Sequence, residues 1–324
     1  MRLTLESFKE EHPQEVLWFN GHVIGTQGSY TYIVGREGTG KSYIASCMAA
    51  AVIRQGDTLC FSGWLPEGKA KVLLVDTEQS RYYEEDVYRR ILQMLGYKEG
   101  EDCPLLVYEE AYKFSDEKLC QRIEEILKNE KDIGYVIIDN AGDLVEDVNS
   151  IPETRKTVRE WLPRLCHDYG IHATVLMHEN KSDHNGQGWQ GSYFKKGCEA
   201  MFRVCREEKD NFSTVTFNNG KKRGSERPKE FYFFIDADGI PTPGKGDEVA
   251  EPCENISQTQ HIEVVNIAFS GGAIFGYRAL VEKISEAYQK VGLGASRKRI
   301  ERRIVFLRQE KYIHYDRGHF FIEA

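Results

Sequence analysis

Short apolar segments alternate with longer amphipathic segments through the first two hundred residues of the chain. The short segments are rich in β-branched and aromatic residues, and they predict strands at 30–34, 58–61, 70–75, 105–108, 135–138 and 173–177. The longer segments have apolar positions three or four residues apart, and they predict helices at 41–55, 81–95, 116–128 and 153–169. Repeated strand–helix–strand order is typical of a mostly parallel sheet covered by helices on both faces. We therefore expect an α/β fold.

The pattern changes after residue 200. Predicted strands at 201–205, 213–217 and 230–235 follow one another without helices between them, which predicts an antiparallel extension of the sheet. Proline and glycine then interrupt the pattern at 241–247, and polar residues continue from there to 258. We expect three parts, namely a first domain over 1–245, a linker over 246–258 and a second domain over 259–324.

The second domain contains predicted helices at 258–269, 277–291 and 296–309, followed by short strands at 312–315 and 319–322. Ser296 is a favourable N-cap for the third helix. Three helices followed by a hairpin resemble a winged-helix domain.

Composition places the chain among ordinary globular proteins, because 40% of its 324 residues are hydrophobic and 29% are charged. Its longest apolar run is too short to cross a membrane, and its acidic N-terminal region does not resemble a secretory signal. Its eight cysteines are scattered, which favours reduced thiols. We therefore expect a cytoplasmic protein with no membrane partner.

A phosphate-binding loop is the clearest chemical motif. The sequence from Gly35 to Ser42 fits G-x-x-x-x-G-K-[ST] and lies between a predicted strand and a predicted helix. In that setting backbone N–H groups and a helix N-terminus meet a polyphosphate, so we expect ATP to bind here. Lys41 is expected to reach the phosphates and Ser42 to coordinate Mg²⁺. The residues assigned to the nucleotide are Gly35, Gly38, Thr39, Gly40, Lys41 and Ser42.

Two further strands end in carboxylates. Asp139 follows the apolar strand 135–138, where it is expected to hold Mg²⁺; capping the next turn is the alternative. The next residue is Asn140, so a glutamate that could activate water is absent there. Glu78, just beyond the strand 70–75, is the candidate base. Asp76 competes with it for that role, and Glu78 could instead cap the following helix.

These motifs, in this order, resemble the RecA-like ATPase superfamily, in which the catalytic glutamate lies on a separate strand. More narrowly, they are similar to plasmid RepA-type hexameric helicases. The resemblance covers 18–243 and rests on 34–42, 76–78, 136–139 and 175–181. It implies that ATP and Mg²⁺ bind between subunits of a ring, expected to be a hexamer. It also implies that His178 senses the γ-phosphate, with local hydrogen bonding as the alternative.

The same resemblance implies DNA contacts and a residue pair that acts on a neighbouring subunit. The segment 180–197 resembles a flexible pore loop that touches single-stranded DNA, which assigns Trp189, Lys195 and Lys196 to DNA, with Tyr193 as another stacking candidate. An ordinary surface loop is the alternative. After a predicted turn at 219–220, Lys221 and Arg223 match the spacing of a Lys-x-Arg pair that reaches the neighbour's ATP. The alternative is a solvated basic turn.

The second domain is basic, whereas the rest of the chain is acidic. Residues 259–324 carry eleven Lys or Arg and seven Asp or Glu, although the whole chain has a formal charge of −8. A basic helix can contact nucleic acid. The third predicted helix supplies the candidates Arg297, Lys298, Arg302 and Arg303. Protein binding or simple solvation are the alternatives.

Together these features predict an ATP-dependent, ring-forming DNA motor that resembles RepA-type replicative helicases. Two rivals stay open: an ATP-switched DNA-binding initiation or regulatory factor, and a KaiC-like or recombinase-like ATPase. The appended second domain departs from the bare ATPase domain common among RepA-type motors, so a loading or initiation role stays open beside unwinding. Expected partners are DNA, further copies of the chain, and replication or mobile-element proteins.

Overall fold

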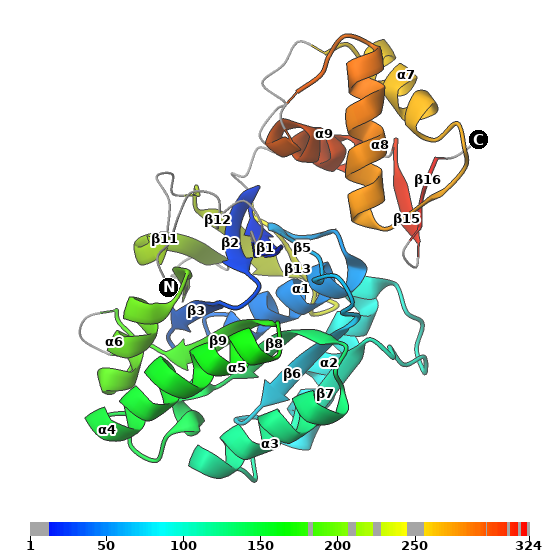
Figure 1. The fold of residues 1–324 in the computed structure, drawn as a ribbon. Coiled ribbons are helices and arrows are strands. Elements are labelled where there is room, and N and C mark those ends of the chain that lie inside the picture. Colours follow the sequence, from blue (N-terminus) through cyan, green and yellow to red (C-terminus); the bar gives the residue numbers. More distant parts are fainter. Residues whose placement is uncertain are drawn as a thin grey trace, which may run out of the picture.

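The structure, a computed structural model, describes residues 13–180, 184–206, 212–222, 228–244, 256–295, 297–309, 312–316 and 319–322 (Figure 1). Within these residues a nine-stranded sheet has the order β13-β12-β11-β10-β3-β9-β8-β6-β7. The strands from β10 to β7 pair in parallel, and β11, β12 and β13 extend the sheet in antiparallel order. The predicted α/β fold is therefore confirmed. In chain order the strands are β3 (Tyr30–Gly35), β6 (Lys71–Asp76), β7 (Leu106–Glu110), β8 (Ile133–Asp139), β9 (His172–His178), β10 (Ala200–Arg206), β11 (Ser213–Lys222), β12 (Phe231–Ile235) and β13 (Pro241–Pro243).

Helices cover both faces of the sheet because successive strand residues point to opposite sides. Val72 and Leu74 of β6 face α1 (Lys41–Arg54) and α2 (Arg81–Leu95), whereas Leu73 and Val75 face α3 (Asp116–Asn129). Also on the second face is a continuous helical segment of α4 (Ile151–Thr154), a π-helical stretch (Arg155–Trp161) and α5 (Leu162–Asp168). The predicted helix 153–169 is thus irregular in its middle. Pro163 lacks the N–H that a regular α-helix would bond to the carbonyl of residue 159.

A small four-stranded sheet packs beside α1. Its order is β2-β1-β5-β4, with β1 (Glu15–Phe19), β2 (His22–Thr26), β4 (Asp57–Thr58) and β5 (Phe61–Gly63). The predicted single strand 58–61 is wrong in detail, because the chain turns between Thr58 and Phe61, where Leu59 has φ 57°.

Two other segments differ from the prediction. The segment 180–197 contains α6 (Gly188–Gly197), so its last ten residues are helical rather than a flexible loop. Gly191, in the interior of that helix, allows close packing, because a Cβ there would collide with the backbone of Gly186. Strand β11 continues to Lys222 without a turn at 219–220, and a break in its register against β10 absorbs the extra residues.

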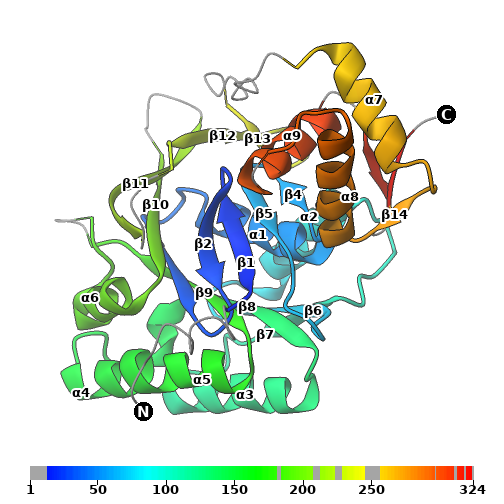
Figure 2. The same ribbon diagram turned by 45° about the horizontal axis from the view of Figure 1, so that its top comes forward.

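The C-terminal part forms a unit of three helices and a three-stranded antiparallel sheet with the order β14-β16-β15 (Figure 2). A capping box of Ser257 and Gln260 begins the first helix. Ile300, Ile304 and Leu307 of the third helix are buried against the other two. Its elements are α7 (Gln258–Ala268), β14 (Ile274–Phe275), α8 (Tyr277–Lys290), α9 (Arg297–Gln309), β15 (His314–Asp316) and β16 (His319–Phe321).

This C-terminal unit contacts the small sheet. The Arg308 guanidinium donates to Asp57 Oδ2 at 2.7 Å, and Trp64 packs against the apolar cluster of the unit. Trp64 also stacks on Trp18 of β1, with ring centroids 3.6 Å apart. Among the described residues, no helix is long and apolar enough to cross a membrane.

Candidate nucleotide site

The phosphate-binding loop connects β3 to α1 at the carboxyl edge of the central sheet. Gly40 lies in the left-handed region at φ 98° and is the N-cap of α1, where no side chain caps the first N–H groups. The Thr39 hydroxyl donates to the carbonyl of Arg36 at 2.8 Å and closes the loop. The N–H groups at the start of α1 are therefore oriented to bind an anion.

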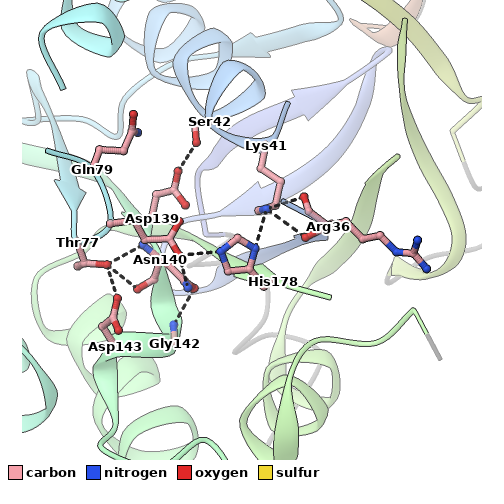
Figure 3. Close-up of polar contacts among 12 residues, drawn as sticks. Arg36, Lys41, Ser42, Thr77, Gln79, Asp139, Asn140, Gly142, Asp143 and His178 are labelled. Atoms are coloured by element: carbon pink, nitrogen blue, oxygen red, sulfur yellow. Dashed lines mark hydrogen bonds and ion pairs between the residues drawn. The ribbon is translucent and has the colours of Figure 1, made fainter. Parts of the chain in front are cut away.

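Lys41 lies inside this loop. Its Nζ donates to the carbonyls of Gly35 at 3.1 Å and Arg36 at 3.0 Å (Figure 3). The side chain is buried, and burial lowers the pKa of its ammonium although Asp139 and Glu78 act in the opposite direction. Lys41 is thus held where phosphate oxygens could replace carbonyl oxygens as its acceptors.

Ser42 and Asp139 meet across the loop. The Ser42 hydroxyl donates to Asp139 Oδ2 at 2.7 Å, and the carboxylate is only 5% exposed. Burial raises the pKa of Asp139 to about 6, and the charges of Asp76 and Glu78 add to that effect. Asp139 Oδ1 is buried and has no hydrogen-bond partner among the described residues. A buried carboxylate oxygen beside a hydroxyl fits Mg²⁺, which prefers oxygen ligands and would neutralise the buried charge.

Glu78 lies at the end of the neighbouring strand and faces the same space. Its Oε1 accepts from Asn140 Nδ2 at 2.8 Å and from His178 Nε2 at 2.7 Å. Burial alone would raise the pKa of Glu78, but the hydrogen bonds from His178 and Asn140 and the charge of Lys41 lower it overall. The lowered pKa keeps the carboxylate ionised at neutral pH, and because the side chain is about a third exposed, water can reach it.

His178 connects Glu78 to Lys41. Its Nδ1 lies 3.3 Å from Lys41 Nζ, which can only donate. Nδ1 therefore accepts, and the proton on Nε2 is donated to Glu78. Lys41, His178 and Glu78 form a hydrogen-bonded chain from the phosphate loop to the exposed carboxylate.

Asp76, the competing candidate for the base, is used differently. It is 1% exposed, and its Oδ1 accepts from the backbone N–H groups of Glu78 and Gln79, each at 3.1 Å. Its Oδ2 accepts from Gln79 Nε2 at 3.0 Å and from the Tyr108 hydroxyl at 2.8 Å. Asp76 therefore shapes the turn that carries Glu78, and its own oxygens are occupied.

Asn140 has a role that sequence reasoning missed. Besides donating to Glu78, its side chain accepts from the Gly142 N–H at 2.9 Å, and its own N–H donates to the Thr77 hydroxyl at 2.9 Å. Thr77 in turn donates to Asp143 at 2.6 Å. These bonds tie the end of β6 to the end of β8. The only signal in the sequence was the absence of a glutamate at position 140. The structure shows that the amide at this position holds the Glu78 carboxylate in place.

A second network was also missed. Glu179, directly after β9, has a side chain only 2% exposed. It accepts from Arg203 Nη2 at 3.0 Å and from His184 Nδ1 at 2.6 Å, and it lies 3.5 Å from Arg36 Nε. Burial opposes ionisation, but the bonds from His184 and Arg203 lower the pKa of Glu179 overall. Glu179 thus links the phosphate loop to β10, and its place next to His178 was the only signal in the sequence.

The site brings together Lys41, Ser42, Glu78, Asp139 and His178 around the loop that contains Gly35, Gly38, Thr39 and Gly40. The residues predicted to contact DNA or a neighbouring subunit lie elsewhere. Lys221 donates to the carbonyls of Lys195 at 3.1 Å and Lys196 at 2.8 Å, so it caps the C-terminus of α6. Trp189, at the start of α6, is 48% exposed, and Lys195 Nζ donates to Asn185 at 3.0 Å. Arg223 lies outside the described residues.

Of the predicted DNA-binding residues on α9, the structure describes the side chain of one. The assignment of Arg303 to DNA is corrected, because its side chain is 5% exposed. Its guanidinium donates to the carbonyl of Leu293 at 2.6 Å and lies 4.3 Å from the ring of Tyr288. The side chains of Arg297, Lys298 and Arg302 lie outside the described part of the structure.

Comparison with known proteins addresses the family. Residues 3–184 match the AAA domain family AAA_25, and a search of curated proteins finds no match. The crystal structure of the RadB recombinase is similar over 68% of this chain and 92% of that chain, at 17% identity and a TM-score of 0.46. The family match covers more than half of the chain and includes the phosphate loop, Glu78 and Asp139. The chain therefore belongs to the AAA domain family AAA_25 and is a P-loop ATPase.

Proposed function

We propose that the chain is a ring-forming DNA motor of the RepA-type helicase class that hydrolyses Mg²⁺–ATP between subunits. The observation that carries the proposal is the hydrogen-bonded chain Lys41–His178–Glu78, which joins the phosphate loop to an ionised carboxylate. This row of hydrogen bonds would allow a nucleotide bound in the phosphate loop to influence Glu78, the proposed base.

In the proposed mechanism, the loop N–H groups and Lys41 bind the phosphates, and Lys41 exchanges the carbonyls of Gly35 and Arg36 for phosphate oxygens. Ser42 and Asp139 would hold Mg²⁺, which supplies neutralisation of phosphate charge when bound. Glu78 orients the attacking water and accepts its proton, while Asn140 and His178 fix the carboxylate. Movement of Lys41 to the γ-phosphate breaks its contact with His178, which reports that ATP is bound.

The neighbouring subunit completes the site in this proposal. Arg223, with Lys221, reaches the neighbour's phosphates and stabilises charge in the transition state. Lys221 must then exchange the carbonyls of α6 for phosphate oxygens. Turnover would therefore depend on assembly of the ring, for which we propose six subunits.

We also propose that residues 1–245 form the ATPase domain, 246–258 a linker and 259–324 a winged-helix-like domain. The apolar cluster built from α7, α8 and α9 supports this division, because it is distinct from the two clusters on either side of the central sheet. The second domain would recruit DNA or a replication partner through Arg297, Lys298 and Arg302.

A second candidate is an ATP-switched DNA-binding initiation factor. The contact of Arg308 with Asp57, three residues beyond the end of α1, favours it, because α1 begins at the phosphate loop and could transmit nucleotide state to the C-terminal unit. A protein of this kind would hydrolyse ATP slowly and would not separate DNA strands.

The test uses the full chain and its Glu78→Gln variant, with Glu99→Gln as a matched control, because Glu99 is 92% exposed. We expect wild type to show DNA-stimulated ATP hydrolysis and displacement of a labelled strand from a forked duplex. Glu78→Gln should bind ATP yet lose at least about 10²-fold in turnover, while Glu99→Gln keeps it. Stimulation without displacement would favour a recombinase-like ATPase, and DNA binding without stimulation would favour the switch. An active Glu78→Gln variant would contradict the assignment of the base.

A further inference from the structure

A groove lies between α6 and the π-helical stretch Arg155–Trp161. It measures about 460 Å³ and is open to solvent. The two elements pack side by side on the second face of the central sheet (Figure 1). The groove is lined by Arg155, Arg159, Glu160, Tyr193 and Lys196.

The groove is positively charged. Three cations line it and only one carboxylate, Glu160, whose Oε1 lies 3.9 Å from Arg155 Nε. Both partners of that pair are mostly exposed, at 70% for Arg155 and 64% for Glu160, so water screens their attraction. The groove therefore favours an anionic ligand.

One aromatic side chain, Tyr193, lies among these charges, and Trp189 precedes it on the same helix. Trp189, Tyr193 and Lys196 are four and three residues apart on α6, so they share one face of the helix. The Lys196 ammonium lies 5.6 Å from the centre of the Tyr193 ring, and Trp189 exposes 48% of its surface. Arg155 and Arg159, also four apart, line the opposite side. Cations that meet phosphates beside rings that stack on bases are the pattern of single-strand binding surfaces.

The helix that carries these rings is fixed to the nucleotide site. The side chain of Gln190 is fully buried and donates to the carbonyl of Ala141 at 2.8 Å, one residue beyond Asn140. Its backbone N–H donates to the carbonyl of Val148 at 3.1 Å. At the other end, Lys221 caps the last turn. The position of the groove wall therefore depends on the segment that follows Asp139.

We propose that this groove binds the backbone and bases of a single-stranded nucleic acid. This inference rests on the proposed function as a DNA motor and says where on the protein the DNA strand lies. It adds Arg155 and Arg159 to the DNA-binding residues that the sequence predicted. Phosphates contact Arg155, Arg159 and Lys196, while bases stack on Tyr193 and Trp189. None of the five residues that line the groove belongs to the nucleotide site, so the strand can bind without entering that site.

The test measures binding of a fluorescein-labelled thirty-nucleotide oligo-dT to the full chain by anisotropy, over a series of salt concentrations. The perturbed variant is Arg155→Ala/Arg159→Ala. Its control is Lys156→Ala/Arg164→Ala, which removes the same charge from the same helical segment at residues 71% and 64% exposed that do not line the groove. Unchanged thermal melting midpoints show that both variants fold.

We expect the groove variant to weaken binding about tenfold or more and to reduce the slope of log K against log salt by about 1.4, because each of the two arginines neutralises one phosphate and each phosphate contributes about 0.7 to the slope. Tyr193→Leu should weaken binding about tenfold with the salt slope kept, because it removes stacking alone. The control should bind as wild type does.

Three results would overturn the inference in distinguishable ways. Equal weakening of the groove variant and the control would show a general charge effect rather than a groove. Wild-type affinity in the groove variant would indicate a surface for another partner, such as an acidic protein segment. Failure of wild type to bind any DNA with an ATP analogue present would contradict the proposed motor itself.

Discussion

Asp139 is a buried carboxylate that costs stability when no cation is bound. Its pKa rises from 3.8 to about 6 through burial and the charges of Asp76 and Glu78. This increase in pKa corresponds to roughly 3 kcal/mol of lost stability once the group is ionised. Replacing it in Asp139→Asn removes that charge but leaves an amide N–H₂ in place of the unpartnered Oδ1, which costs about 1–2 kcal/mol. We expect a net gain of about 1–2 kcal/mol above neutral pH.

The sign of the pH dependence follows from the direction of the shift. A carboxyl whose pKa is raised by folding favours the folded state below its unfolded pKa, and this advantage is lost as pH rises through the folded value. The contribution of Asp139 to the free energy of unfolding therefore changes between about pH 4 and pH 6. Between pH 7.5 and pH 4.5 the advantage of Asp139→Asn over wild type should shrink by about 2 kcal/mol.

Thermal melting in EDTA measures this difference, and at pH 7.5 the variant should melt about 2–6 °C above wild type. Addition of Mg²⁺ and ADP should stabilise wild type more than the variant, because the variant lacks the carboxylate that would hold the ion. ATP turnover by the variant should be lost despite its higher melting midpoint. A variant that melts at or below wild type at both pH values would show that the Asp139 carboxylate does not destabilise the ion-free protein.

Two further predictions concern the base and the neighbouring subunit. In Asn140→Leu, Glu78 loses a hydrogen bond that lowers its pKa. The acid limb of the ATPase pH profile, measured from pH 4.5 to 8.5, should therefore move to higher pH. An unchanged acid limb would contradict a role of Asn140 in setting the pKa of Glu78. Mixing Arg223→Ala subunits with Lys41→Ala subunits should restore part of the turnover that each variant lacks alone, because a mixed ring contains some sites with both residues intact; no recovery in a coupled-enzyme assay would remove Arg223 from the trans role.

Local patterns in the sequence predicted much of the fold. The amphipathic helix 81–95 has the predicted bounds, and the strands carrying Glu78 and Asp139 lie where apolar runs placed them. The hairpin β1–β2 was overlooked although the sequence contained its signal, since Asn20-Gly21 between apolar runs is a typical two-residue turn.

The segment 180–197 shows why other parts could not be predicted. Its glycines suggested mobility, yet Gly191 serves the close packing of a helix that only the tertiary structure defines. Lys221 and Arg303 carry charges that suggested solvent or DNA, but both donate to backbone carbonyls contributed by other elements. Side-chain pairs such as Asn140 with Glu78 join residues 62 positions apart, which no local pattern specifies.

The contact of Arg308 with Asp57 has a consequence for dividing the protein. A chain ending at residue 244 would leave the Asp57 carboxylate without the Arg308 guanidinium. The other oxygen of this carboxylate, Oδ1, has no hydrogen-bond partner among the described residues even in the full chain. It would also uncover the ring of Trp64, which packs between Trp18 and the C-terminal cluster. The ATPase body and the C-terminal unit therefore share part of their folding energy, and truncation disturbs the far end of the helix that begins at the phosphates. Point substitutions on α9 separate the roles of the two parts more cleanly than truncation does.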